Sequence, residues 1–393
     1  MSGAQEQYSA QTGIYLDHNA TTAVHEEVFE AMRPWLTGHF GNASSAHAPG
    51  LAAARAVMMA QEQVAALIGA KPDEVLFTSG GTESNNLALF GSLARHGGLH
   101  FAVSTIEHPA VESPAQVLTR RGHRCRRLPV DREGRVDLEV AKRDLAAPIH
   151  LLSVMLAHNE TGVVQPVAEL AGMARAMNHR VVVHTDAAQA VGKLDVDVSR
   201  LDVDLLTIAG HKFCAPKGVG ALYVRRGTKL TPLLYGGGQQ NGVRPGTEAV
   251  PLVVGLGAAA VLAARDLLDE GARQRTLRER LWQALRGRIE GMWRVEPDVE
   301  RPELALPNTL YCAFPGCAGA AVLAGARAVA ASTGSACHAH GAEQPGVLTA
   351  MGVPMATSRG AVRLSLGRMT TEADVDRAAR SLVDAWTRLG REH

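Results

Sequence analysis

Short apolar runs alternate with helix-length stretches through the first two thirds of the chain. Runs with the character of strands are VLFT, HFAVS, LLSVML, VVVHT and LLTIA, and each ends in a polar or glycine-rich turn. Strands that alternate with helices in this way predict right-handed crossovers and a mainly parallel sheet. We therefore expect an α/β fold, followed by a C-terminal part with shorter, mixed elements.

Three stretches have a clear helical pattern. The first covers Glu26–Leu36, the second is alanine-rich and covers about Leu51–Ile68, and the third covers Pro251–Arg286. The longest uncharged apolar run, Ala249–Ala264, is short for a membrane span, which needs about 20 residues, so it is typical of a buried helix. The third helix is expected to lead into a second domain.

Polar residues follow the predicted strands at the point where each strand ends. In parallel sheets, ligands bind beyond the carboxyl ends of the strands, so side chains at these ends converge on one site. The residues in such positions are Thr82, His108, Asn159, Asp186 and Lys212. Taken singly, each has a plain structural interpretation, and a lone histidine at a strand end is more often structural than catalytic.

The segment FTSGGTESNN has the order strand, glycine turn, helix. Backbone N–H groups at such a helix start form an anion site, to which the Thr82 hydroxyl can add a hydrogen bond. An ordinary N-capped helix is the alternative, because Thr and Ser cap helices widely. We interpret Gly81 and Thr82 as a candidate phosphate site.

Lys212 lies in TIAGHKFCAPKGVG, directly after a strand and before a loop rich in glycine and proline. This position suits an amine that points into a pocket, although a lone lysine could also be a solvated loop residue. A helix start for a phosphate, Asp186 for a pyridine nitrogen and Lys212 for an aldehyde together meet the needs of pyridoxal phosphate (PLP). A buried aspartate would be costly without such a cationic partner. We therefore predict that Lys212 holds PLP as a Schiff base.

The C-terminal part carries two further candidates. Cys337 lies in the small-residue stretch STGSACHAHG, where the flanking histidines His338 and His340 could lower its pKa. These three residues could instead bind zinc, or Cys337 could be a passive loop cysteine. Arg363 lies in the strand-like run AVRLSL and could bind a carboxylate through two hydrogen bonds, or could be a surface arginine.

Composition narrows the class of protein. The 393 residues are 46% hydrophobic and 20% charged with a net charge of +1, which indicates a globular protein of two or three domains and argues against nucleic-acid binding. The N-terminal residues lack the apolar core of a signal peptide. Five scattered cysteines suggest reduced thiols. We expect a cytoplasmic protein that does not interact with membranes.

The motifs together resemble a known family. In chain order they are YLDHNATT, FTSGGTESNN, EHPA, NETG, HTDAAQA, GHK…PKG, GGGQ…RPGTE, STGSAC and VRLSLG. The chain resembles the cysteine desulfurases of aminotransferase class V from about Tyr15 to the C-terminal helix, and looks closest to their selenocysteine lyase branch. The resemblance implies PLP fold type I, as in aspartate aminotransferase. Residues 26–265 would form the large PLP-binding domain with a mainly parallel seven-stranded sheet, and residues 14–25 and 266–393 a smaller α+β domain.

The resemblance also implies roles for individual residues. Lys212 would form the Schiff base and move protons, His108 would stack on the PLP ring as an acid or base, and Cys337 would be the nucleophile that takes sulfur or selenium. Asn159 and Arg363 would orient the substrate. The implied cofactor-binding residues are Gly81, Thr82, His108, Asn159, Asp186, Gln189, His211, Lys212 and, from the other subunit of a homodimer, Thr247.

The implied activity is conversion of L-cysteine to L-alanine, with a persulfide on Cys337 that passes to an acceptor protein. A selenocysteine lyase acting on L-selenocysteine is the main alternative. A class V aminotransferase, which needs no thiol, and a non-enzymatic scaffold that binds an acceptor protein are further alternatives.

Four positions depart from the family pattern. Ala209 stands where many desulfurases have a serine, which removes one expected phosphate hydrogen bond. His158 replaces a common asparagine, and Gln240 replaces a usual glutamate. Cys214 stands where an aromatic residue is frequent and is a candidate second reactive thiol.

Overall fold

The structure, a computed structural model, describes residues 13–94, 98–295, 301–333 and 346–390. Its largest sheet has seven strands in the order β2-β8-β7-β6-β5-β3-β4. Neighbouring strands are parallel except at β8, which is antiparallel to both β2 and β7. The predicted mainly parallel α/β sheet is therefore confirmed. The strands are β2 (Val75–Thr78), β3 (His100–Ser104), β4 (Arg124–Leu128), β5 (Leu151–Ser153), β6 (Val182–Asp186), β7 (Leu205–Ala209) and β8 (Gly220–Val224).

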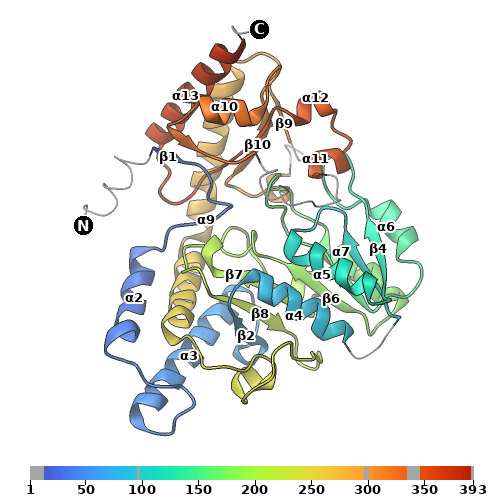
Figure 1. The fold of residues 1–393 in the computed structure, drawn as a ribbon, viewed down its shortest axis with the longest axis vertical. Coiled ribbons are helices and arrows are strands. Elements are labelled where there is room, and N and C mark those ends of the chain that lie inside the picture. Colours follow the sequence, from blue (N-terminus) through green and yellow to red (C-terminus); the bar gives the residue numbers. More distant parts are fainter. Residues whose placement is uncertain (1–12, 95–97, 296–300, 334–345, 391–393) are drawn as a thin grey trace.

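Helices cover both faces of this sheet (Figure 1). One face packs on α4 and α5 through residues such as Phe101, and the other face packs on α3, α7 and α9 through residues such as Ala102. Strands buried on both faces must be apolar throughout, which is why the inner strands appear in the sequence as continuous apolar runs, whereas the edge strand β4 (RCRRL) is partly exposed. The helices of this layer are α2 (Glu26–Thr37), α3 (Ala48–Leu67), α4 (Gly81–Leu93), α5 (Pro109–Arg120), α6 (Leu138–Asp144), α7 (Val167–Met177) and α8 (Val198–Leu201).

A second body has its own sheet and core. Strand β10 (Thr309–Ala313) lies between β9 (Trp293–Arg294) and β12 (Ala361–Ser365), antiparallel to both. The helices α10 (Gly319–Gly325) and α13 (Glu372–Gly390) contribute to its hydrophobic core, and α11 (Val347–Ala350) and α12 (Met355–Ser358) lie in the same part of the chain. The N-terminal strand β1 (Ile14–Tyr15) joins this body by pairing in parallel with β11 (Val329–Ala330).

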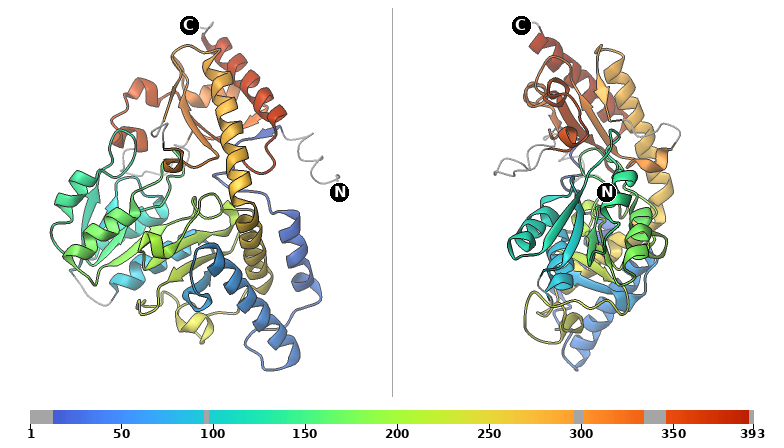
Figure 2. Two further views of the ribbon diagram at one scale, coloured as in Figure 1. Left: turned by 180° about the vertical axis from the view of Figure 1, so that it is seen from behind. Right: turned by 90° about the vertical axis from the view of Figure 1, so that its right-hand side faces the viewer.

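Helix α9 (Val250–Arg286) connects the two bodies. Its 37 residues make it about 55 Å long, and Figure 2 shows it running along both bodies as one continuous rod. Leu256 belongs to the core beside the large sheet, whereas Leu281 belongs to the second core. The boundary predicted at residues 265/266 lies within this helix. By length and composition α9 could cross a membrane, but half of its most apolar window is buried in the protein, as in a core helix.

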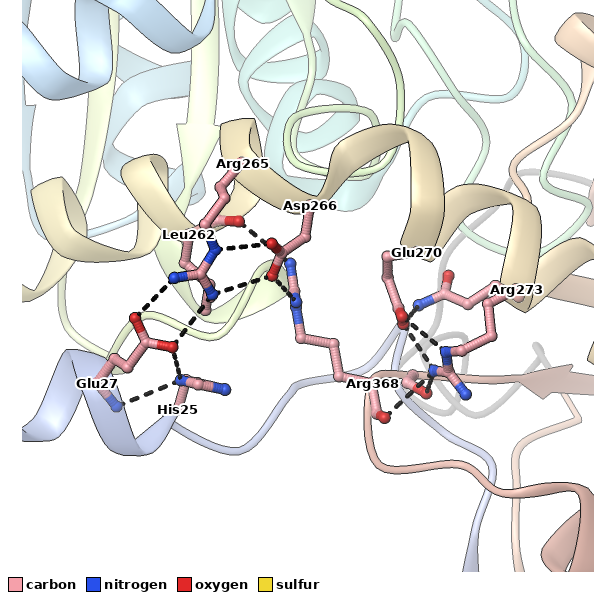
Figure 3. Close-up of polar contacts among 10 residues, drawn as sticks. His25, Glu27, Leu262, Arg265, Asp266, Glu270, Arg273 and Arg368 are labelled. Carbon is pink, nitrogen blue, oxygen red and sulfur yellow. Dashed lines mark hydrogen bonds and ion pairs between the residues drawn. The ribbon is translucent and has the colours of Figure 1, made fainter.

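Charged residues line α9 where it passes between the bodies (Figure 3). Arg265 pairs with Glu27 of α2 at 3.0 Å and with Asp266 at 2.7 Å. Asp266 also pairs with Arg368 at 2.6 Å, and Arg273 donates to the carbonyl oxygens of residues 367 and 370 at 2.9 and 2.7 Å. We call Glu27, Arg265, Asp266, Arg273 and Arg368 the α9 seam.

Candidate active site

Three predicted residues lie beyond the carboxyl ends of the parallel strands. Asp186 is the last residue of β6, Lys212 ends the short 3-10 turn Gly210–Lys212 after β7, and His108 precedes α5. The His108 ring accepts a hydrogen bond from the backbone N–H of Ala110 at 3.1 Å, which caps the helix. Burial lowers the pKa of His108, and the charges of Asp186 and Lys212 act on it in opposite directions. Asp186 and Lys212 therefore both lie within electrostatic reach of His108.

The start of α4 provides the predicted anion site. Gly80 has a φ of +146°, and the Ser84 N–H donates to the Gly80 carbonyl at 3.1 Å. The N–H groups that precede Ser84 therefore lie at the open end of the helix. A Cβ on Gly81 would come within 3.3 Å of the Ala209 Cβ, so the two small residues pack closely. The side chain of Thr82 is exposed. This arrangement suits a phosphate group.

His211 follows β7 beside this helix start. Its Nδ1 lies 3.1 Å from the Thr21 hydroxyl oxygen. Burial, and then the positive charges of Lys212 and Lys217, lower the pKa of His211 to about 4. The imidazole is therefore neutral at pH 7 and would meet a phosphate as a hydrogen-bonding group.

Asp186 is buried, with 6% of its surface exposed, and neutral groups hold its carboxylate. The Asn85 side chain donates to Oδ2 at 2.7 Å, and the backbone N–H of Ala188 donates to Oδ1 at 2.9 Å. Within the part of the chain that the structure describes, no ion pair involves Asp186. A buried carboxylate oriented in this way fits a cationic ligand atom such as a pyridinium N–H. The sequence did not point to Asn85, although it lies one helical turn after Gly81.

The N-terminal segment lies across Lys212. The Lys212 Nζ donates to the carbonyl oxygens of Asn19 and Ala20 at 2.7 and 2.9 Å. The Thr22 N–H and hydroxyl both donate to the His211 carbonyl, at 2.9 and 3.0 Å. The motif YLDHNATT therefore holds the lysine turn in place, which explains why it belongs to the site although it lies about 190 residues away in sequence.

A polar cluster around Asn19 joins both bodies. The Asn19 Oδ1 accepts from Lys193 Nζ at 3.1 Å and from Asn308 Nδ2 at 3.0 Å, and its Nδ2 donates to the Thr309 hydroxyl at 2.8 Å. Gln189 donates to the Asn19 carbonyl at 3.0 Å and accepts from Lys193 at 2.7 Å. We call Asn19, Gln189, Lys193, Asn308 and Thr309 the Asn19 cage.

The Lys193 amine is held by neutral oxygens of the cage, the side-chain oxygens of Asn19 and Gln189. Burial, and then the charge of Lys212, lower the pKa of Lys193 to about 7. In the sequence this lysine follows the motif HTDAAQA by three residues and was not predicted to belong to the site. The only signal was its closeness to that motif, because a lysine in a loop more often points into solvent.

Arg363 on β12 is buried, with 6% of its surface exposed, so the interpretation as a surface arginine is wrong. Its Nη1 donates to the Asn159 carbonyl at 3.0 Å and its Nη2 donates to the Asp17 carboxylate at 2.6 Å. The Asn159 carbonyl also accepts from the Asn19 side chain at 3.2 Å. Among the described residues, no group accepts a hydrogen bond from the Arg363 Nε.

This chain does not bring Thr247 into the site, and Cys337 lies outside the residues that the structure describes. Thr247 is exposed, and its proposed partner site belongs to a second subunit. Cys337 lies in residues 334–345, outside the described residues, together with His338 and His340.

The departures from the family pattern have physical consequences. His158 accepts from the N–H groups of Thr161 and Glu160 at 3.1 and 3.3 Å, so its ring caps the turn as an asparagine would. Gln240 accepts from the Phe77 N–H at 2.9 Å and so ties its loop to β2. Burial raises the pKa of Cys214, which disfavours a reactive thiolate.

Comparison with known proteins gives a consistent assignment. The family description "Aminotransferase class-V" matches residues 14–378, so the chain belongs to this family. Relatives place it among the cysteine desulfurases of that family. "Cysteine desulfurase" of Gluconacetobacter diazotrophicus is 45% identical over 369 residues, which cover 93% of this chain and 91% of the relative. "Cysteine desulfurase IscS" of Dictyoglomus turgidum is 42% identical, with 92% of both chains covered.

Solved structures agree with this assignment. A "NIFS-LIKE PROTEIN" superposes with a TM-score of 0.87 at 34% identity, covering 95% of this chain and 98% of the other. "SspA in complex with cysteine" has a TM-score of 0.77 at 34% identity, covering 90% and 98%. The fold type expected from the motifs is therefore confirmed, whereas none of these matches specifically supports the selenocysteine lyase branch.

Proposed function

We propose that this protein is a PLP-dependent cysteine desulfurase that converts L-cysteine to L-alanine and keeps the sulfur as a persulfide on Cys337. The main support for the proposal is that three features lie at one edge of the sheet. They are Lys212, Asp186 with its hydrogen bonds from neutral groups, and the open N-terminal end of α4. Relatives named cysteine desulfurase, and a neighbour solved in complex with cysteine, support L-cysteine as the substrate.

The described residues fit PLP. The N–H groups of Gly81 and Thr82, with His211, would hold its phosphate, and Asp186 would pair with its ring nitrogen. Gln189 would contact the ring oxygen through its amide, whose orientation the bond from Lys193 fixes. When bound, PLP supplies an electron sink that makes the substrate Cα proton acidic.

The protein's own groups would perform the remaining steps. Arg363 binds the substrate carboxylate, assisted by Asn159, and Lys212 takes the proton from Cα. The Cys337 thiolate attacks the substrate Sγ, so an S–S bond forms and the Cβ–Sγ bond breaks. Cβ then takes up a proton and Lys212 returns a proton to Cα, which gives L-alanine and a Cys337 persulfide. Burial lowers the pKa of His108, so it is neutral at pH 7, and because its Nδ1 accepts from the Ala110 N–H, its Nε2 carries the proton and can donate it.

The persulfide must be discharged, and we propose a thiol or an acceptor protein for this step. We also propose a cytoplasmic homodimer in which Thr247 reaches the partner's site. Supporting features are the exposure of Thr247 and of the nearby large apolar residues Leu234 and Tyr235, which are 55% and 85% exposed. Sedimentation of the purified protein tests the dimer: a monomer at micromolar concentration would contradict it.

A paired turnover assay on PLP-loaded protein tests the proposed reaction. L-cysteine and L-selenocysteine are supplied separately with a reductant, and alanine is quantified for the wild type and for Cys337→Ala. We expect alanine from L-cysteine that is lost in the variant. Alanine from L-selenocysteine alone would instead make the protein a selenocysteine lyase. No alanine from either substrate would favour the class V aminotransferase, and a protein that takes up no PLP would favour the scaffold.

A further inference from the structure

The guanidinium group of Arg363 already has a carboxylate partner inside the protein. Asp17 accepts from Nη2 at 2.6 Å, while the neighbouring Nε is buried and has no hydrogen-bond partner among the described residues. Guanidinium groups bind carboxylates best through two parallel N–H···O bonds. Of the two donors that would form such a fork, Nη2 is therefore occupied by Asp17, and Nε has no hydrogen-bond partner among the described residues.

We propose that Asp17 is a resident competitor for the substrate carboxylate at Arg363, and that it sets the affinity for substrate and product. An incoming α-carboxylate displaces Asp17 from Nη2 and takes Nε as well, so a bond through one oxygen is replaced by a fork of two. This inference rests on the proposed role of Arg363 in binding substrate. Asp17 acts through Arg363 and is a positioning residue, not a catalytic one.

The surroundings allow this exchange. The Arg363 side chain is 7% exposed, whereas that of Asp17 is 23% exposed, so water can solvate the aspartate when it is released. The bond from Nη1 to the Asn159 carbonyl holds the guanidinium in place when its other partner changes. The backbone of Asp17 is fixed independently, because its carbonyl accepts from the Ala20 N–H at 2.9 Å. The side chain of Asp17 can therefore move without unfolding its segment.

The charged groups near Arg363 affect how strongly it binds a carboxylate ligand. Lys193 lies close enough for the Arg363 charge to lower the pKa of its amine. A second carboxylate entering beside Asp17 meets like-charge repulsion, so the resident carboxylate weakens substrate binding. The same repulsion speeds the departure of L-alanine, which carries the same carboxylate. Asp17 thus lowers the affinity of the site both for the substrate L-cysteine and for the product L-alanine.

Asp17→Asn tests the proposal, because it keeps the side-chain shape and removes the charge. We expect the KM for L-cysteine to fall about fivefold with no rise in kcat. A fivefold change corresponds to about 1 kcal/mol of binding free energy that is regained when Asp17 no longer competes for Arg363. We expect the same change in the dissociation constant of L-alanine, measured by calorimetry on PLP-loaded protein without turnover. Asp73→Asn, in the exposed pair with Arg226, is the matched control and should leave both constants unchanged.

A double-mutant cycle with Arg363→Gln shows whether Asp17 acts through the arginine. In the Arg363→Gln background, Asp17→Asn should no longer change the affinity for L-alanine. A rise in KM with weaker L-alanine binding in Asp17→Asn would show that Asp17 only supports Arg363, and unchanged constants would show no coupling; either result overturns the proposal. Asp17→Ser is a second variant if the first does not fold. Because calorimetry needs no turnover, its result is separable from failure of the desulfurase assay.

Discussion

The α9 seam and the Asn19 cage both connect the two bodies, but they use opposite chemistry. The seam joins them through the ion pair of Arg368 and Asp266, which are 22% and 26% exposed, and it continues to α2 through the pair of Arg265 and Glu27, which are 53% and 57% exposed. The cage joins them with neutral oxygens and amides around one amine, and Asn19 is only 1% exposed. The seam therefore contains more charged side chains, whereas the polar side chains of the cage are more deeply buried.

This difference teaches that the number of ion pairs is a poor measure of what holds the bodies together. Exposed ion pairs contribute little because water and salt screen them. A buried polar group that loses its partner costs about 1–3 kcal/mol, and a charged one costs more. We therefore expect the cage to dominate both the stability of the domain junction and the geometry of the site.

The largest effect is expected for Asn19→Ala. This change removes the acceptor of Lys193 and Asn308 and the donor to Thr309, so several buried groups lose partners. We expect a loss of about 3 kcal/mol or more in the free energy of unfolding, measured with urea on the PLP-loaded protein. Asn42→Ala, in an exposed turn, is the control. A loss no larger than that of the control would contradict the dominance of the cage.

The pH dependence of Lys193 gives the next effect. Its pKa is about 7 in the folded protein against 10.5 as the ordinary value, so the unfolded chain binds more protons between these pH values. Stability therefore rises with pH across this window, by up to about 1.4 kcal/mol per pH unit. Lys193→Met should remove this part of the rise, as seen in urea unfolding at pH 7, 8 and 9. An unchanged slope would mean that the amine is not desolvated.

On the acid side, two buried histidines outside the cage can be compared with a carboxylate of the seam. Burial lowers the pKa of His18 and of His184 to about 4, so stability is lost as the pH falls from about 6.5 to 4. Asp266 of the seam has a pKa of about 2, lowered by Arg265, so its contribution is lost only below about pH 4. We expect His184→Gln to reduce the drop in unfolding midpoint between pH 6.5 and 4.5, and Asp266→Asn to leave that drop unchanged. The reverse pattern would contradict the view that a buried histidine, and not a seam carboxylate, sets the loss of stability in this pH range.

The smallest effect is expected for Arg265→Gln in the seam. Because both partners of its pair with Glu27 are open to water, the thermal unfolding midpoint should stay close to that of the wild type. Any difference should shrink further between 0.05 and 0.5 M salt. A large, salt-independent drop would show that the seam holds the bodies together after all.

Much of the fold and part of the site could be predicted from the sequence, for a specific reason. The inner parallel strands are continuous apolar runs, and their polar endings fix where residues such as Asp186 and Lys212 lie, whereas the edge strand β4 (RCRRL) is partly exposed and was not predicted. Local pattern was less exact at β5, which ends at Ser153 although the apolar run continues to Leu156.

The cage and the Asp17–Arg363 pair could not be predicted, because their partners are remote in sequence. Asn19 meets Lys193 across 174 positions and Asn308 across 289. No local periodicity in the sequence indicates which remote residues are in contact. The residue types also suggest the wrong environment, because an isolated lysine or aspartate in a loop normally has a solvated side chain. Only the tertiary fold converts these residues into buried partners.

The pairing of β1 with β11 has a consequence for protein synthesis. Ile14 pairs with Val329, so the first strand waits for a partner made 315 residues later, roughly 15–60 s at typical ribosomal speeds. The large sheet ends at Val224 and can form while translation continues. The segment that covers Lys212 receives a further anchor only when Ser365 emerges, whose hydroxyl oxygen accepts from the Asn19 N–H at 3.0 Å. Chains that end before Ser365 can therefore form the large sheet and the bonds between Thr22 and His211, but lack the contacts that tie this segment to the second body.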